Sequence, residues 1–161
     1  MTSITNQLTT MSLSGSINVI NRKGEIMPLH LETISKRLNE LAQMPPKLNI
    51  STDIIAIKTA SSLIDGIKTS EIDNISAGIC ASLIVDDYEY DTLAARIIIS
   101  SLHKVTYNDL RMYAKSLRSY EYRDTEIKIL HPKTIAFILE NSKDLHDLID
   151  YQKAYSYNSF G

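Results

Sequence analysis

The sequence predicts a mainly α (α+β) fold, because a single hairpin signal is followed by several segments with helical periodicity. Residues 18–31 contain two short apolar segments around the turn NRKG, which is the pattern of a small β-hairpin. Residues 87–104 place apolar side chains at i, i+3, i+4, i+7 and i+8, which is one face of an α-helix. With three further helical segments between them, residues 18–104 make a compact unit of ordinary domain size.

Two residues set the geometry of the predicted hairpin. Gly24 ends the turn and can supply the positive φ that a tight turn needs. Pro28 lies in the return segment, and because proline has no backbone N–H it fits an edge strand best. Residues 1–17, which precede the hairpin, are rich in Ser and Thr and are expected to form a flexible N-terminal extension.

Four helices are expected after the hairpin, and their start and stop signals can be read from the sequence. Pro45-Pro46 ends the first helix, Ser51 is the expected N-cap of the second, and Gly66 lies past its end. At the start of the third helix, Ser70 and Asp73 have the spacing of a capping box. The expected bounds are residues 32–43, 51–64, 69–83 and 87–104.

The fourth helix carries one arginine, Arg96, outside its apolar stripe. We expect this side chain either to be solvated at the edge of the helix or to have a more particular role. Beyond the fourth helix the sequence predicts a capped helix over 106–117, a polar and aromatic loop over 119–132, a helix opened by Pro132, and a segment 143–161 that begins helical and ends extended.

Composition excludes several classes of function. The net charge is −2, which gives no broad electrostatic basis for binding nucleic acid or an anionic membrane. The only cysteine, Cys80, excludes an internal disulfide and a CxxC zinc site, and it fits a reducing, cytoplasmic compartment. The histidines lack a second ligand at metal spacing, and no apolar run approaches the ~20 residues of a membrane span. We therefore expect no metal site, no membrane and no direct nucleic-acid partner.

Three motifs, in order along the chain, resemble one protein family. Val-Ile-Asn-Arg-Lys-Gly at residues 19–24 resembles the Val-Ile-Lys-Arg-Asp-Gly motif that opens an ATP-cone. LAARIIISSLHK at 93–104 is similar to the last cone helix in the large subunit of class I ribonucleotide reductase. DYQKAYSYNSFG at 150–161 resembles the start of the catalytic region of that subunit.

The resemblance implies an ATP-cone over residues 18–106, in which a small β-hairpin or sheet caps a four-helix bundle and additional helices follow. Residues 107–161 would then be the helical, truncated start of the reductase catalytic region. The implied effectors are ATP and dATP, with no other cofactor. The implied partners are the remainder of the large subunit, the small radical-generating subunit and further copies of the chain in a homo-oligomer. The family makes deoxyribonucleotides for DNA synthesis with three cysteines, so this chain alone is expected to be inactive and to hold no catalytic residue.

The resemblance also implies an allosteric nucleotide site in the cone. By position, Asn21 and Arg22 stand where the family hairpin offers Lys-Arg, and Thr69 and Asp73 stand where the third helix offers Thr and Asp. We expect the side chains of Arg22, Thr69 and Asp73 to converge around one hollow. Arg96 is expected to be a structural ion-pair partner rather than a contact of the nucleotide.

Three departures from the family pattern weaken the expected site. Asn21 replaces a lysine, Met27 takes a position that is often acidic, and Thr33 replaces a second lysine. Two cationic phosphate contacts are therefore absent from their usual places. Because a charge-assisted hydrogen bond contributes about 1.5–3 kcal/mol, losing both would weaken binding by on the order of a hundredfold or more.

Two lysines offer a replacement for the lost charge. Lys23 points to the same face of an extended strand as Asn21, and Lys36 lies about one helical turn after Thr33. One hypothesis is that the positive charge has moved to these lysines, and the alternative is that both are ordinary solvated side chains. A second interpretation of the whole chain is a degenerate cone that keeps the fold but serves only in structural or subunit contacts.

Overall fold

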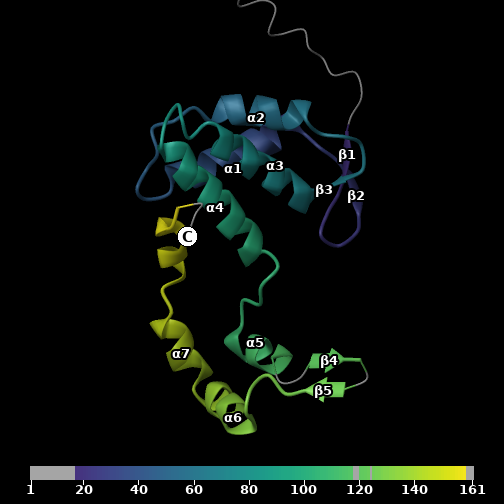
Figure 1. The fold of residues 1–161 in the computed structure, drawn as a ribbon, viewed down its shortest axis with the longest axis vertical. Helices are drawn as coiled ribbons and strands as arrows, with labels where there is room; N and C mark the ends of the chain where they lie inside the picture. Colours follow the sequence, from purple (N-terminus) through teal and green to yellow (C-terminus); the bar gives the residue numbers. More distant parts are fainter. Residues whose placement is uncertain (1–16, 118–119, 124, 159–161) are drawn as a thin grey trace, which may run out of the picture.

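The computed structural model describes residues 17–117, 120–123 and 125–158. Residues 1–16, which make up nearly all of the expected N-terminal extension, lie outside the described residues. The predicted mainly α fold with a small sheet is confirmed (Figure 1). The first helices are α1 (Leu31–Gln43), α2 (Thr52–Ser61), α3 (Thr69–Ser82) and α4 (Glu89–His103).

A three-stranded sheet combines the hairpin with a later strand. It consists of β1 (Asn18–Ile20), β2 (Ile26–Pro28) and β3 (Ile67–Lys68), in the order β2-β1-β3. β2 is antiparallel to β1 and β3 is parallel to it. The hairpin prediction is confirmed, since Gly24 has φ +84° in the turn and Pro28 belongs to the edge strand β2.

β3 has no counterpart in the sequence prediction, because two residues are too short to show strand periodicity. Polar contacts hold this segment against β1. The Asp65 carboxylate accepts a hydrogen bond from the Asn18 N–H at 2.8 Å, and the Gly66 N–H donates to the Asn18 carbonyl at 2.8 Å. Gly66 has φ +79°, a conformation that costs glycine little. The start of α3 is thereby fixed beside the hairpin.

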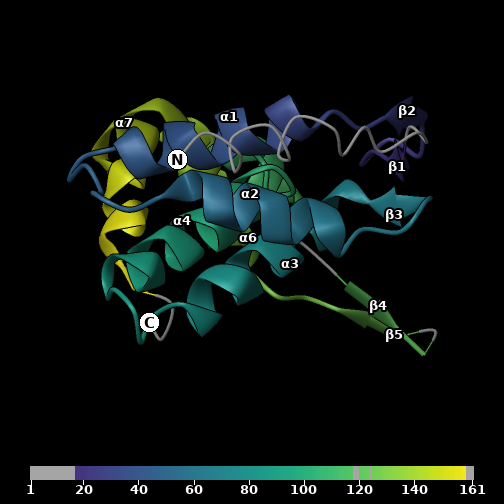
Figure 2. The same cartoon turned by 90° about the horizontal axis from the view of Figure 1, so that it is seen from above.

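The hydrophobic core lies between the first four helices and β1. α1 packs on α2 and α4, and α3 packs on the same two helices. The sheet lies at one end of α1, α2 and α3, as Figures 1 and 2 show. Burying one large apolar side chain stabilises a fold by about 1.5–3 kcal/mol. The most deeply buried apolar residues include Val19, Leu38, Ile55, Leu93 and Ile97.

The helix boundaries differ from the prediction at two places. α2 ends at Ser61 rather than at residue 64, because the Ser62 and Leu63 N–H groups bond to carbonyls three residues back instead of four. The capping box predicted from Ser70 and Asp73 is wrong. Lys68 is the N-cap of α3, and the Glu71 carboxylate accepts a long, 3.5 Å hydrogen bond from the Lys68 N–H. Asp73 instead forms ion pairs with side chains of other elements.

A second group of elements follows α4 and extends away from it (Figure 1). A two-stranded antiparallel sheet pairs residues 120–122 with residues 125–127, so the predicted loop is wrong there. The alternating segments YEY and TEI carry a strand signal, which their polar character masks. The elements are α5 (Leu110–Ser116), β4 (Tyr120–Tyr122), β5 (Thr125–Ile127), α6 (Pro132–Glu140) and α7 (Ser142–Leu148).

The two helix-start signals predicted after α4 have different outcomes. The N-cap of α5 is Asp109 rather than Thr106, and the Asp109 carboxylate accepts a 2.7 Å hydrogen bond from the Arg111 N–H. This backbone hydrogen bond lowers the pKa of the Asp109 carboxyl, and the nearby Arg111 charge adds to the effect. α6 begins at Pro132, as predicted.

Segment 143–161 begins helical, as predicted, but its helical structure extends as far as Ser156. Tyr157 then has extended backbone angles (φ −75°, ψ 155°), and residues 159–161 lie outside the described residues. A 3-10 helix, η1 (Tyr151–Ser156), returns to the side of α4. Asp150 caps η1 by accepting a 3.1 Å hydrogen bond from the Gln152 N–H. The Tyr155 hydroxyl lies 3.2 Å from His103 Nδ1, and the two rings meet edge to face with centroids 5.4 Å apart. These contacts seat η1 on the last turn of α4.

Arg96 is fully buried, with 0% of its surface exposed, so of the two alternatives for this residue the solvated position is wrong. Its Nη1 donates to the Leu41 and Met44 carbonyls at 2.9 and 3.0 Å, and its Nη2 donates to the Pro46 carbonyl at 2.7 Å. These carbonyls lie at the end of α1, where a helix leaves acceptors without partners and its dipole favours a cation. Three carbonyl oxygens thus replace the expected carboxylate partner. Burial lowers the pKa of the guanidinium, and the charge of Glu89 opposes this effect.

Cys80 is fully buried, and burial raises the pKa of its thiol from 9.0 to about 12. At mildly alkaline pH this shift lowers the thiolate fraction by about a thousandfold, and the thiolate is the reactive form. We expect the folded chain to react with DTNB at least about a hundredfold more slowly than the chain in concentrated guanidinium chloride. The release of thionitrobenzoate measures both rates, and equal rates would contradict the buried position of Cys80.

Candidate functional site

A pocket of about 260 Å³ lies between the β1–β2 turn, α1, α3 and α4. The apolar side chains that line it are Leu29, Ile34, Leu38, Ile72 and Ile97. The hydroxyl side chains that line it are Thr33, Thr69 and Ser76. Mostly apolar walls with a few polar groups are typical of sites for small organic ligands.

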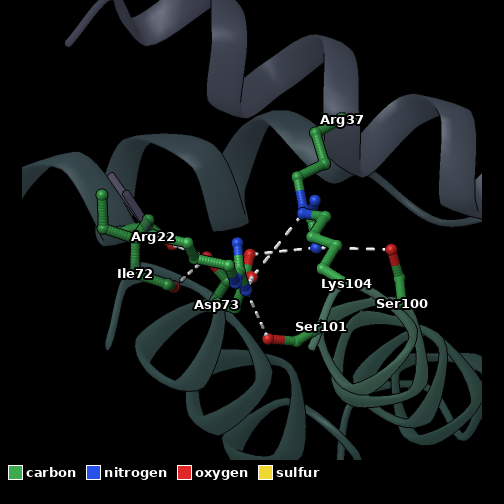
Figure 3. A network of polar contacts seen from close by, with 9 residues as sticks. Arg22, Arg37, Ile72, Asp73, Ser100, Ser101 and Lys104 are labelled. Atoms are coloured by element: carbon green, nitrogen blue, oxygen red, sulfur yellow. Dashed lines mark hydrogen bonds and ion pairs between the residues drawn. The ribbon is translucent and has the colours of Figure 1, made fainter. Parts of the chain in front are cut away.

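Three cationic side chains meet at one carboxylate in this pocket. Asp73 Oδ1 lies 3.0 Å from Arg37 Nη2, and Asp73 Oδ2 lies 3.1 Å from Arg22 Nη2 and 3.8 Å from Lys104 Nζ. Figure 3 shows the four side chains pointing toward one another from the hairpin, α1, α3 and the end of α4. Only 8% of the Asp73 side chain is exposed. Three positive charges against one negative charge leave an excess of two, which attracts anions.

The sequence of α4 explains how this helix contributes to the cluster. Its apolar stripe continues from Ile97 through Ser100, Ser101 and Lys104, at i, i+3, i+4 and i+7. The same face that packs in the core therefore becomes polar where it reaches the pocket. Ser101 Oγ accepts a 3.0 Å hydrogen bond from an arginine of the hairpin turn, and Ser100 Oγ accepts a 3.4 Å hydrogen bond from an arginine of α1.

Arg37 and Lys104 are the pocket residues that sequence reasoning missed. A signal for both was present, because each is a cation at a position that the helical period assigns to the apolar face. On α1, Arg37 lies three residues after Ile34 and four before Leu41. A charged residue in such a stripe either disrupts the core or lines an opening in it. Here the Arg37 side chain is 26% exposed and lies at the pocket.

Four of the predicted site residues line the pocket. Arg22, Thr69 and Asp73 converge on one hollow, as expected, and Thr33 lies beside them on α1. Arg22 comes from the β1–β2 turn, whereas Thr69 and Asp73 occupy successive turns of α3. Whether these side chains contact a nucleotide stays a prediction.

The other four predicted site residues lie outside the described lining of this pocket. Asn21 stabilises the turn, because its Oδ1 accepts from the Lys23 and Glu25 N–H groups at 2.8 and 3.0 Å. Lys23 is exposed in the same turn, and Met27 is 45% exposed on the edge strand. The Lys36 side chain is 80% exposed and lies 4.0 Å from a glutamate one turn along α1. Their contribution to nucleotide binding also stays a prediction.

Metal sites and membrane-spanning helices are both absent from the described residues. Within residues 17–117, 120–123 and 125–158, no group of three or more His, Cys, Asp or Glu side chains could hold a metal ion. In the same part of the chain, every helix is too short or too polar to cross a membrane.

Comparison with known proteins gives one family match and several curated relatives. Residues 17–105 match the family described as the ATP cone domain. The ribonucleoside-diphosphate reductase large subunit of Caenorhabditis elegans is 32% identical over 153 residues, which cover 94% of this chain and 19% of the relative. The large subunit of Dictyostelium discoideum is 31% identical over 152 residues, 89% of this chain and 17% of the relative.

The large chain of the same reductase from Cryptosporidium parvum is 32% identical over 146 residues, which cover 88% of this chain and 18% of the relative. The chain therefore spans less than a fifth of the length of these curated relatives. In all three, the similarity extends beyond the part that matches the family model.

Proposed function

The chain belongs to the ATP-cone domain family, and from that premise we propose that it binds ATP or dATP in the pocket between the β1–β2 turn, α1, α3 and α4. The observation that carries this proposal is the convergence of Arg22, Arg37 and Lys104 at a pocket with apolar walls. Arginine forks and lysine ammonium groups are the side chains that recognise phosphates. An apolar surface beside them suits the face of a nucleobase.

The pocket offers separate surfaces to the two parts of a nucleotide, the nucleoside and the phosphates. Its volume of about 260 Å³ is just below the ~300–1,000 Å³ that is usual for small-molecule sites. The base and ribose can occupy the part of the pocket beside the hydroxyl groups of Thr33, Thr69 and Ser76, while the phosphates extend to the cations. This arrangement leaves the phosphates at the end of α4, next to the elements that follow the cone.

The role proposed for the site is allosteric regulation of a ribonucleoside-diphosphate reductase large subunit. The names of the curated relatives and the coverage of residues beyond the cone support this role. The single cysteine of this sequence is buried in the cone. Reduction itself would therefore depend on the parts of a large subunit that lie outside the region of similarity. The remaining large-subunit chain and the small, radical-generating subunit are the proposed partners, and the cytoplasm is the proposed compartment.

Titration of the 161-residue chain with ATP and dATP tests the proposed binding directly. A ligand that binds only the folded state at about 100 times its Kd stabilises it by about 2.7 kcal/mol. For a domain of this size that corresponds to a rise in Tm of roughly 5–10 °C. Differential scanning fluorimetry measures the shift, and calorimetry gives the Kd. No shift at millimolar ATP or dATP would favour the degenerate cone, which serves only structural or subunit contacts.

The relocated-charge hypothesis has its own test in the same assay. If Lys23 and Lys36 hold the phosphates, Lys23→Ala and Lys36→Ala should each weaken ATP binding by about tenfold or more. If the wild-type chain binds ATP and neither variant changes the Kd, the charge missing at Asn21 and Thr33 is supplied from elsewhere. Arg37 and Lys104 are then the candidates, since both line the pocket.

A further inference from the structure

We propose that Asp73 is a built-in competitor of the phosphate ligand: its carboxylate lies among the three cations of the pocket, and a polyphosphate must displace it from them to bind. This inference rests on the proposed nucleotide site and adds a regulatory property to it. The pocket would contain its own anion among the cations that a phosphate needs. Its affinity for phosphate would therefore be set by the strength of an internal ion-pair cluster.

Both carboxylate oxygens of Asp73 contact cations, as the oxygens of a bound anion would. Oδ1 lies 3.0 Å from Arg37, and Oδ2 lies 3.1 Å from Arg22 and 3.8 Å from Lys104. A phosphate group between the same three cations would be held in the same way, through separate oxygens. The cations face inward from three different elements, and Asp73 lies at their centre (Figure 3).

Partial burial makes this internal contact stronger than an ion pair in open solvent. The Asp73 side chain is 8% exposed and its arginine partners are 27% and 26% exposed. The ion pair between Lys36 and Glu40 on α1 offers a contrast, since its side chains are 80% and 67% exposed and 4.0 Å apart. Solvent screens such an exposed pair, whereas a partly buried pair keeps much more of its Coulomb energy.

The two arginines have second acceptors that hold them in place when the carboxylate leaves. Arg22 Nη2 donates to Ser101 Oγ at 3.0 Å, and Arg37 Nη2 donates to Ser100 Oγ at 3.4 Å. Both serines belong to α4, and they direct the two arginines at the pocket. The local net charge is +2 with Asp73 ionised and +3 if a neutral side chain replaces it. The carboxylate thus lowers the attraction of the pocket for every anion.

Inorganic pyrophosphate tests this inference, because it has the charge of a polyphosphate but no base or sugar. Its Kd would be measured by calorimetry, without divalent cations, on the 161-residue wild-type chain, Asp73→Asn and Asp73→Ala. Asp53→Asn is the matched control, since it removes the same charge from an exposed position on α2. Circular dichroism and the Tm without ligand show that each variant is folded.

We expect Asp73→Asn and Asp73→Ala to bind pyrophosphate about tenfold or more tightly than the wild type, and Asp53→Asn to bind as the wild type does. Both Asp73 variants should also have a lower Tm without ligand, and pyrophosphate should restore it. Equal or weaker pyrophosphate binding in the folded Asp73 variants would overturn the inference, because the carboxylate would then support the ligand instead of competing with it.

The same samples separate this inference from the proposed function. ATP and dATP binding to the wild-type chain decides whether the pocket is a nucleotide site. A wild-type chain that ignores nucleotides, together with an Asp73→Asn variant that binds pyrophosphate more tightly, would refute the nucleotide site and support the competitor role of Asp73. ATP binding with unchanged pyrophosphate affinity in Asp73→Asn would support the nucleotide site and refute the competitor role of Asp73.

Discussion

Replacement of Arg96 by methionine is expected to lower the free energy of unfolding by about 3–5 kcal/mol, because it leaves three carbonyl groups without their donor, one in a buried and two in partly buried hydrogen bonds. Methionine fills most of the space of the aliphatic part of arginine, so the loss would come from the polar contacts rather than from a cavity. In a domain of this size the Tm should fall by roughly 6–20 °C. Urea unfolding followed by circular dichroism measures the change.

Arg111→Met is a suitable control for the Arg96 variant. Its guanidinium side chain is 60% exposed beside Asp109, so its replacement should change the free energy of unfolding by less than about 1 kcal/mol. Arg96→Lys provides a second comparison, because it keeps the charge but loses the planar fork that reaches three carbonyls. If Arg96→Met were as stable as the wild type, the carbonyl contacts at the end of α1 would contribute nothing to the fold.

Arg37→Gln is expected to weaken ATP binding by about 10–150-fold, which corresponds to the loss of one charge-assisted hydrogen bond worth about 1.5–3 kcal/mol. Glutamine keeps an amide donor, but its side chain is two bonds shorter, so the variant removes the charge, the fork and part of the reach. The effect should shrink as salt is raised, because the lost contribution is electrostatic. Calorimetric titration of ATP into the two chains at several salt concentrations measures both the Kd and its salt dependence.

Lys58→Gln makes the matched comparison for Arg37. It removes the same charge from an exposed position on α2, away from the described lining of the pocket. Its Kd for ATP should equal that of the wild type. An Arg37→Gln variant that binds ATP as tightly as the wild type would show that Arg37 serves only as an ion-pair partner of Asp73.

The fold was largely predictable because its signals are local. The stripes of α1, α3 and α4 follow the helical period, and the hairpin has a turn glycine and an edge proline. Structure that depends on distant contacts was not predictable in this way. β3 is a strand only because Asn18 and Asp65 bring residues 67–68 against β1. The tail becomes η1 where Tyr155 reaches His103.

The pocket shows the same division between local and distant information. Arg22, Thr69 and Asp73 could be proposed from motifs, whereas Arg37 and Lys104 required knowing which helix faces meet. Arg96 was the hardest to assign, since its partners are backbone carbonyls near residue 44 and no side chain there has a complementary charge. A lone cation in an otherwise apolar helix thus indicates a polar contact, although the sequence does not identify the partner.

The pocket gathers its cations from nearly the whole length of the cone, and this affects when it can form. Arg22 contacts Asp73 and Ser101 across separations of 51 and 79 residues. Closing such long loops is slow compared with forming a helix. During synthesis on a ribosome, the complete cluster can form only after the end of α4 has left the exit tunnel. A nascent chain that stops before α4 lacks Lys104 and the two serines that accept hydrogen bonds from Arg22 and Arg37.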